Sequence, residues 1–247
     1  GGMRRTLGPL LCELHAHSTW SDGELDVAEL VDLHGRNGFD VICLTDHVIR
    51  TGDPAGASIG CRTVDADSFD SYLEDVEREA ARAWRTYGLL VIPGLELTFN
   101  DVEPVKSAHA LAIGLRSFVS VDRGIAEAMR TAAEARAAII AAHPYDGEHA
   151  SDLTPAGRLT KRFARDAGLR VLAHRFELFN RTRLFGWVAE AGLPAVACGD
   201  FHRSAHLAGW KTLLPSMHDE VAVVDYLRSP RPVYLVRLDH ELAQLAA

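Results

Sequence analysis

Histidine and carboxylate side chains are spaced in this sequence as metal ligands would be. Residues 13–23 read E-L-H-A-H-S-T-W-S-D-G, with His15 and His17 directly after a short apolar run. In a strand, residues two apart point to the same face, so two imidazoles would project side by side from one strand end. Asp22-Gly23 predicts a turn that returns a carboxylate towards them. This stretch therefore predicts part of a metal site.

Further histidines and carboxylates occur where other apolar, strand-like runs end. They are His47 in T-D-H, Glu96 in P-G-L-E-L-T, His109 in S-A-H-A, His143 in A-A-H-P, and Asp200 and His202 in G-D-F-H. Strand-terminal residues of a β/α barrel meet at its C-terminal face, so these side chains should converge with His15, His17 and Asp22. Mixed nitrogen and oxygen donors suit Zn, Mn or Fe(II) better than Ca or Mg. Because the set exceeds the needs of one ion, we expect two or three divalent ions, with Glu96 placed to bridge.

Each of these motifs alone is a weak indication, because a His-x-His pair is more often two surface or core histidines. The repetition at successive strand ends is what favours a metal site. The remaining histidines lack this placement and serve as a comparison. We expect His34 on the polar side of a helix, and the others in loops or terminal segments: His149, His174, His206, His218 and His240. All are expected to be solvated or capping residues, with His206 the strongest candidate for an exception.

Strand-like and helix-like segments alternate along the whole sequence. The expected strands are 10–15, 39–45, 89–96, 107–114, 137–142, 175–179 and 194–199. The expected helices are 26–36, 66–86, 121–135, 155–167, 182–191 and 218–228. Asp26 and Glu29 predict a capping box at the start of the first helix, and Gly38 its end. This alternation predicts an α/β fold with a mostly parallel sheet, closed as an irregular β/α barrel.

One connection departs from this alternation. Only about a dozen residues separate Glu96 from His109, too few for a parallel crossover once the strand ends are counted. The strand at 107–114 is therefore expected to run antiparallel to the preceding strand, as its hairpin partner. That arrangement would place His109 at the same end of the sheet as Glu96.

Composition limits the class of protein. The chain has 247 residues, 47% of them apolar, and a formal charge of −8, which argues against a polymeric nucleic acid as substrate or partner. Four cysteines without a C-x-x-C pair indicate reduced thiols in a cytoplasmic protein, and no apolar run has the length of a membrane span. We expect a single domain over 3–247, because Gly1-Gly2 before Met3 resembles a remnant of cloning.

In their order, the motifs H-A-H-S-T-W-S-D-G, L-T-D-H, G-L-E-L-T, the isolated His109, A-A-H-P and G-D-F-H resemble those of the PHP (polymerase and histidinol phosphatase) superfamily. The resemblance covers residues 13–202. It implies a distorted (β/α)7 barrel with a trinuclear metal site at the C-terminal face of the strands. The superfamily acts mostly on phosphate esters, so the resemblance implies a metal-dependent phosphoesterase.

The resemblance also implies how the ligands divide among three ions. The first would take His15, His17, Glu96 and Asp200; the second Glu96, His109 and His143; the third Asp22, His47 and His202. Asp22 stands where some members have histidine, so the third site is expected to differ in affinity or metal preference. The expected catalytic residues are Glu96, Asp200 and His202, around a metal-bridging hydroxide that attacks the phosphorus of a small phosphorylated substrate.

A phosphate substrate would need further polar contacts near the ions. The candidates are Lys106, Asn180, Arg203, Lys211 and Arg62, the last in the glycine-rich loop 48–65. For each of the first four, a solvated surface position is about as expected as a contact with phosphate. For the loop 48–65, a surface position is slightly favoured over a role at the site.

Two other functions remain open. The same scaffold could hydrolyse a carboxyl or carbamate ester. Alternatively, the chain could be a non-catalytic, metal-stabilised accessory domain like those attached to polymerases. The second alternative is less favoured, because no ligand position is empty and no polymerase module is visible.

Overall fold

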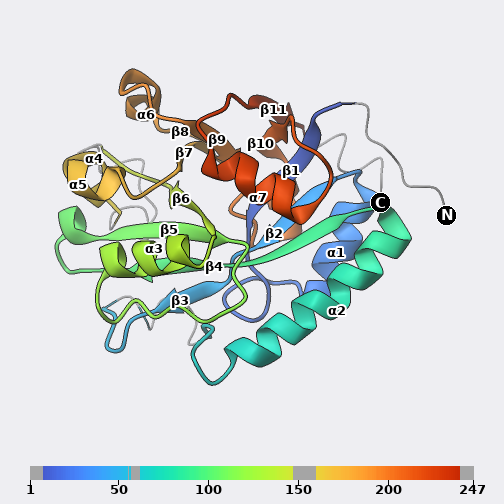
Figure 1. Ribbon diagram of the computed structural model, residues 1–247, viewed down its shortest axis with the longest axis horizontal. Coiled ribbons are helices and arrows are strands. Elements are labelled where there is room, and N and C mark those ends of the chain that lie inside the picture. The colour runs from blue at the N-terminus through green and yellow to red at the C-terminus, as the bar shows by residue number, and fades with distance from the viewer. Residues whose placement is uncertain (1–7, 55, 57–61, 147–159, 240–247) are drawn as a thin grey trace.

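The computed structural model describes residues 8–54, 56, 62–146 and 160–239, and shows helices packed around one curled sheet (Figure 1). The eleven strands of the sheet in this part of the chain are β1 (Leu10–Ala16), β2 (Val41–Leu44), β3 (His47–Ile49), β4 (Leu90–Phe99), β5 (Ala108–Ile113), β6 (Ala138–Ala142), β7 (Arg175–Asn180), β8 (Arg183–Leu184), β9 (Ala195–Cys198), β10 (Gly209–Leu214) and β11 (Tyr234–Leu238). The seven predicted strands are all present.

The sheet is mixed. Its order is β11-β10-β1-β2-β4-β5-β6-β7-β8, with β3 paired to β4 and β9 paired to β7. β1, β2 and β4 run parallel, whereas β5 is antiparallel to both β4 and β6, which confirms the predicted hairpin. Four strands were not predicted from the sequence: β3, β8, β10 and β11. β10 and β11 pair antiparallel to each other, and β10 also to β1.

The sheet curls so that its two halves meet. The Thr212 hydroxyl of β10 bonds to both backbone groups of Ala197 in β9, and a parallel bridge joins Ala16 to Phe201. The strand ends that carry the predicted ligands therefore converge from both sides. This mixed α/β fold with a curled sheet is of the TIM-like barrel kind.

Helices cover the outside of the sheet, and α1 and α2 lie side by side on it (Figure 1). The helices are α1 (Val27–Arg36), α2 (Phe69–Tyr87), α3 (Ile125–Glu134), α4 (Arg162–Arg165), α5 (Ala167–Arg170), α6 (Gly186–Glu190) and α7 (Glu220–Arg228), with a 3-10 turn η1 (Pro104–Lys106) before β5 and another, η4 (Ser204–Leu207), after β9. The predicted capping box is confirmed, with Asp26 Oδ1 accepting from Glu29 N at 2.8 Å and Asp26 N donating to Glu29 Oε2 at 3.0 Å.

Three predicted helices are shorter than expected, and one of them, expected over 121–135, covers only Ile125–Glu134. The segment 182–191 begins with the short strand β8 and forms only one turn of helix, α6. In the predicted helix 155–167, residues up to 159 lie outside the described part of the chain. The remainder breaks at Asp166, whose extended backbone (φ −120°, ψ 98°) separates α4 from α5.

His34 was wrongly expected on the polar side of its helix. It is fully buried, its ring lies against Phe39 and Phe201, and its Nδ1 bonds to the Leu30 carbonyl at 2.9 Å. Burial lowers the pKa of this ring to about 3. The apolar face of α1 is therefore wider than its residue types suggest. Across the described residues, no helix combines the length and apolar character needed to cross a bilayer.

Candidate metal centre

Donor atoms from three separate strands come together around His15 and His17. His15 Nε2 and His17 Nε2, from β1, lie 3.0 Å apart, and each is 3.1 Å from Glu96 Oε2 of β4. Asp200 Oδ1, just after β9, lies 3.4 Å from His15 Nε2 and 3.5 Å from His17 Nε2. With metal–nitrogen bonds of about 2.05 Å, tetrahedral donors stand about 3.3 Å apart. The two imidazole nitrogens and the Glu96 oxygen are therefore spaced as ligands of one ion could be, with Asp200 beside both rings.

Glu96 joins this group to a second one. Its other oxygen, Oε1, lies 3.0 Å from His109 Nδ1 and 3.1 Å from His143 Nε2. The three donor atoms lie within 4.8 Å of one another. The two oxygens of the Glu96 carboxylate therefore face two different donor groups.

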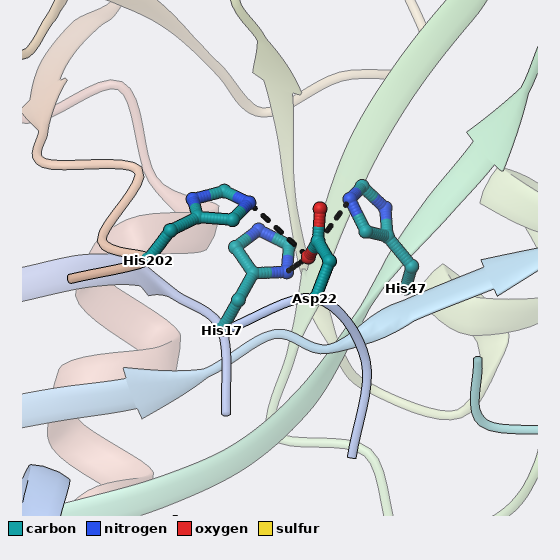
Figure 2. A group of neighbouring side chains, drawn as sticks. All are labelled: His17, Asp22, His47 and His202. Atoms are coloured by element: carbon teal, nitrogen blue, oxygen red, sulfur yellow. Dashed lines mark ion pairs between the residues drawn. The ribbon is translucent and has the colours of Figure 1, made fainter. Parts of the chain in front are cut away.

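A third donor group lies on the other side of His17 (Figure 2). Asp22 Oδ1 is its centre, 3.2 Å from His202 Nε2, 3.6 Å from His47 Nε2 and 3.5 Å from His17 Nδ1. The Asp22 side chain is 27% exposed, whereas Glu96 is fully buried, so this group is the most open of the three.

The hydrogen bonds of the ring nitrogens decide which group His17 can serve. A neutral imidazole has one nitrogen with a free lone pair, and the bonding of the other nitrogen determines which one it is. Ser21 Oγ donates to Asp46 Oδ1 at 2.6 Å and is therefore an acceptor for His17 Nδ1, 3.3 Å away. The free lone pair of His17 is then on Nε2, in the first group.

The other five histidines follow the same rule, each with its second ring nitrogen facing a protein acceptor. These contacts are His15 Nδ1 to Glu177 Oε1 (2.7 Å), His47 Nδ1 to Thr98 Oγ1 (2.7 Å), His109 Nε2 to Asn100 Oδ1 (2.8 Å), His143 Nδ1 to Thr160 Oγ1 (3.4 Å) and His202 Nδ1 to the Asp200 carbonyl (2.9 Å). Six tautomers are thus set so that every free lone pair points into a donor group. Such outer contacts are typical of metal-binding histidines.

Glu177 is the most important of these outer residues, and the sequence analysis missed it. It is fully buried on β7, and its Oε2 also accepts from His143 N at 2.6 Å and Asn180 Nδ2 at 2.8 Å. Its only signal in the sequence was its place in E-L-F-N, three residues before the candidate Asn180. Asp46, the middle residue of T-D-H, was also missed; it accepts from Ser18 and Ser21 and shapes the loop after β1.

The charges in the cluster agree with a cation site. Burial raises the pKa of Glu96 and Asp200, but the surrounding histidines outweigh it and hold both carboxyl pKa values well below their usual range. For His17, burial together with His202 and His47 lowers the pKa to about 3, so the ring is neutral. Burial also lowers the pKa of His15, His143 and His202, but the nearby carboxylates outweigh it and raise these pKa values, that of His202 to about 9. A divalent metal would therefore displace protons from these three rings.

Backbone strain is concentrated at two of the donors. His143 (φ 28°) and Asp200 (φ 45°) are in the left-handed region, which non-glycine residues rarely adopt and which is common at functional sites. Arg181 (φ 56°) shares this feature. Its guanidinium donates to the Asp200 carbonyl at 2.8 Å and lies 3.5 Å from Asp200 Oδ2, so it places a cation at the edge of the site.

One of the predicted substrate contacts is wrong. Lys211 is fully buried in β10, where its ammonium pairs with Glu13, so it cannot reach a substrate. The sequence analysis placed it at the exit of a loop because β10 was not recognised.

The other predicted contacts vary in their placement. Asn180 is buried, and its side-chain amide donates to Glu177, which contacts the donor cluster. Lys106 lies on an exposed turn and pairs with Glu103. Arg203 and Arg62 are exposed, with Arg62 Nη1 donating to the Thr19 carbonyl.

Histidines outside the donor groups have ordinary partners. His206 Nδ1 accepts from His202 N, His174 Nδ1 from Ile139 N, and His218 Nε2 bonds to the Asp40 carbonyl. His149 and His240 lie outside the described residues. Cys12, Cys43 and Cys198 are free and buried, and burial raises their thiol pKa values; Cys61 also lies outside the described part.

No protein-family model matches this chain. The chain is 25% identical over 138 residues to the DNA polymerase/3'-5' exonuclease PolX of Bacillus subtilis (strain 168), a match that spans 56% of this chain and 24% of that polymerase.

Two solved structures share the fold. One is a two-domain protein from Bacteroides vulgatus ATCC 8482 containing a predicted PHP-like metal-dependent phosphoesterase; it matches over 100% of this chain and 74% of its own, with a TM-score of 0.62 and 19% identity. The other is an amidohydrolase from Chromobacterium violaceum with bound sulfate and no metal, covering 93% of this chain and 99% of its own, with a TM-score of 0.55 and 16% identity. The chain therefore has the fold of the PHP-like metal-dependent phosphoesterases, as its ordered motifs predicted.

Proposed function

We propose that this chain is a metal-dependent hydrolase that acts on phosphate esters of a small metabolite. The observation that carries the proposal is the compact group of His15, His17 and Glu96, with Asp200 beside both rings, in which the two ring tautomers leave both free lone pairs facing inwards. A structural cluster of histidines and carboxylates would have no reason to direct these lone pairs at one another.

The ligand assignment follows from the same contacts. We infer a first site of His15, His17, Glu96 and Asp200, a second of Glu96, His109 and His143, and a third of Asp22, His47 and His202. The scaffold is then the distorted (β/α)7 barrel of the superfamily, and the donors suit Zn, Mn or Fe.

Bound divalent ions would polarise the phosphoryl oxygens and produce a nucleophile from water at neutral pH. The residues of the chain would hold and orient the reactants. Glu96 spaces the first two sites, and Asp200 and His202 flank the point of attack from the strand end after β9. The Arg181 guanidinium would neutralise charge on a phosphate oxygen at the edge of the site.

The test is hydrolysis by Zn- or Mn-loaded protein of p-nitrophenyl phosphate, bis-p-nitrophenyl phosphate and naphthyl acetate. We expect phosphate-ester turnover that falls by more than about 100-fold in Glu96→Gln, since outer-shell changes alone cost 10–100-fold. Glu79→Gln, which alters a buried carboxylate paired with Arg82 on α2, is the matched control and should keep full activity.

Other outcomes of this assay decide against the proposal. Turnover of naphthyl acetate without phosphate-ester turnover would assign a carboxyl-ester hydrolase on the same scaffold. Metal binding without turnover of any ester would favour an accessory domain. Unchanged hydrolysis in Glu96→Gln would refute the site itself.

A further inference from the structure

A buried ion pair lies beneath the donor cluster, and the chemistry above does not use it. Glu13 and Lys211 are both fully buried, with Lys211 Nζ 3.1 Å from Glu13 Oε2. Glu13 precedes His15 by two residues on β1, so its side chain points to the same inner face, one layer below. The ammonium also donates to the carbonyls of His206 (3.1 Å) and Ala208 (3.5 Å).

The second oxygen of Glu13 connects two ligand-bearing segments. Glu13 Oε1 accepts from Gly199 N at 2.7 Å and from His15 N at 3.3 Å. Gly199 immediately precedes Asp200, whose backbone has the strained φ of 45°. A Cβ on Gly199 would overlap both Glu13 Oε2 and Lys211 Nζ, so the turn rests directly on the pair. One carboxylate therefore ties β1, at His15 near its end, to the turn that carries Asp200.

Stability alone does not account for this pair. Two charges removed from water rarely stabilise a fold more than apolar side chains of similar volume would, and such replacements are often neutral or stabilising. What an apolar pair cannot provide is an acceptor for Gly199 N. That hydrogen bond acts on the turn that sets the 3.4 Å separation between His15 Nε2 and Asp200 Oδ1.

We propose that Glu13, held in place by Lys211, is a positioning residue for the metal centre. Its Oε1 fixes the Gly199–Asp200 turn against β1, so that His15 and Asp200 stand at ligand distance. This inference rests on the proposed metal-binding function and adds a residue that touches neither metal nor substrate.

The experiment compares two double variants with wild type by Co²⁺ titration, recording the visible absorption of the bound ion and the melting temperature of the metal-free protein. Glu13→Leu/Lys211→Met removes the charges and the acceptor together. Glu13→Gln/Lys211→Met removes the charges but keeps an oxygen for Gly199 N. Arg175→Met is the control: it removes a buried cation that donates to the carbonyls of 226–231, at the opposite end of β7 from the donor cluster.

We expect the Leu/Met variant to bind Co²⁺ about 10–100-fold more weakly than wild type, with a changed visible spectrum but a similar melting temperature. The Gln/Met variant and Arg175→Met should keep the affinity within a few-fold. Wild-type affinity and spectrum in a folded Leu/Met variant would overturn the inference. A loss of Co²⁺ affinity of about 10–100-fold in the Gln/Met variant would also overturn the inference. If the Leu/Met protein does not fold, the affinity of the Gln/Met variant alone decides. If the wild-type protein binds no Co²⁺, the result refutes the proposed metal centre itself, and the positioning role is refuted with it.

Discussion

Replacing Glu177 by glutamine tests how the histidine tautomers are set. Three N–H groups, His15 Nδ1, His143 N and Asn180 Nδ2, converge on the two oxygens of this buried carboxylate. Glutamine has the same shape but only one acceptor oxygen, so its NH₂ must face at least one of these donors. If it faces His15, the proton of that ring moves to Nε2, and the ring loses the lone pair that faces Glu96 and Asp200.

The size of the effect can be worked from this geometry. Glu177→Gln loses one hydrogen bond to a charged acceptor, a change of about 1.5–3 kcal/mol. Changes in the outer contacts of metal ligands lower affinity by about 10–100-fold, which is about 1.4–2.7 kcal/mol. The two ranges agree, so we expect the first ion to bind about 10–100-fold more weakly.

The assay is competition of the protein with a chelator for Zn²⁺ or Co²⁺, and Glu79→Gln is again the matched control. The Glu79 carboxylate is also buried but pairs with Arg82, away from the cluster, so its variant should bind metal as wild type does. A folded Glu177→Gln protein with wild-type metal affinity would refute the argument that this carboxylate sets the His15 tautomer.

Three further predictions follow from the site and the core. Asp22→Asn should lower the metal content by one ion per chain, because Asp22 Oδ1 is the carboxylate oxygen that faces the Nε2 atoms of both His47 and His202 in the most exposed group; retention of all ions on elemental analysis would contradict the third site. Chelation should lower the melting temperature measured by calorimetry, and restored Zn²⁺ or Mn²⁺ should reverse it, since an ion at 1,000 times its dissociation constant contributes about 4 kcal/mol; no shift would argue against tight binding. The pKa of His34 is lowered to about 3, so the folded state favours the neutral ring, and metal-free wild type should lose stability as the pH falls from 6.5 towards 3, by up to about 1.4 kcal/mol per pH unit for this group. His34→Leu should show a smaller loss over the same range in urea unfolding, and an identical pH dependence would show that the ring does not titrate as stated.

Most of the helices and strands that position the site could be predicted, because residues close together in the sequence determine where they begin, end and turn. Asp26 and Glu29 are three residues apart, and their capping box forms within one helical turn. The hairpin of β4 and β5 followed from the short connection between Glu96 and His109. By contrast, β10 was missed because its burial comes from strands far away in the sequence: β1 on one side and β9 through Thr212.

The sequence by itself indicated which side chains would converge, because two histidines two apart on one strand share a face. That the ends of different strands meet depended on the barrel-like fold. Only the tertiary structure decided how those donors divide and which ring nitrogen each one offers. The contact that sets the tautomer of His15 comes from Glu177, 162 residues away, and the one that anchors Gly199 comes from Glu13, 186 residues away. Contacts of this kind have no periodicity along the chain, so they exist only once the sheet has curled. For the same reason Lys211, which its sequence position suggested as a substrate contact, proves to be a buried partner of Glu13.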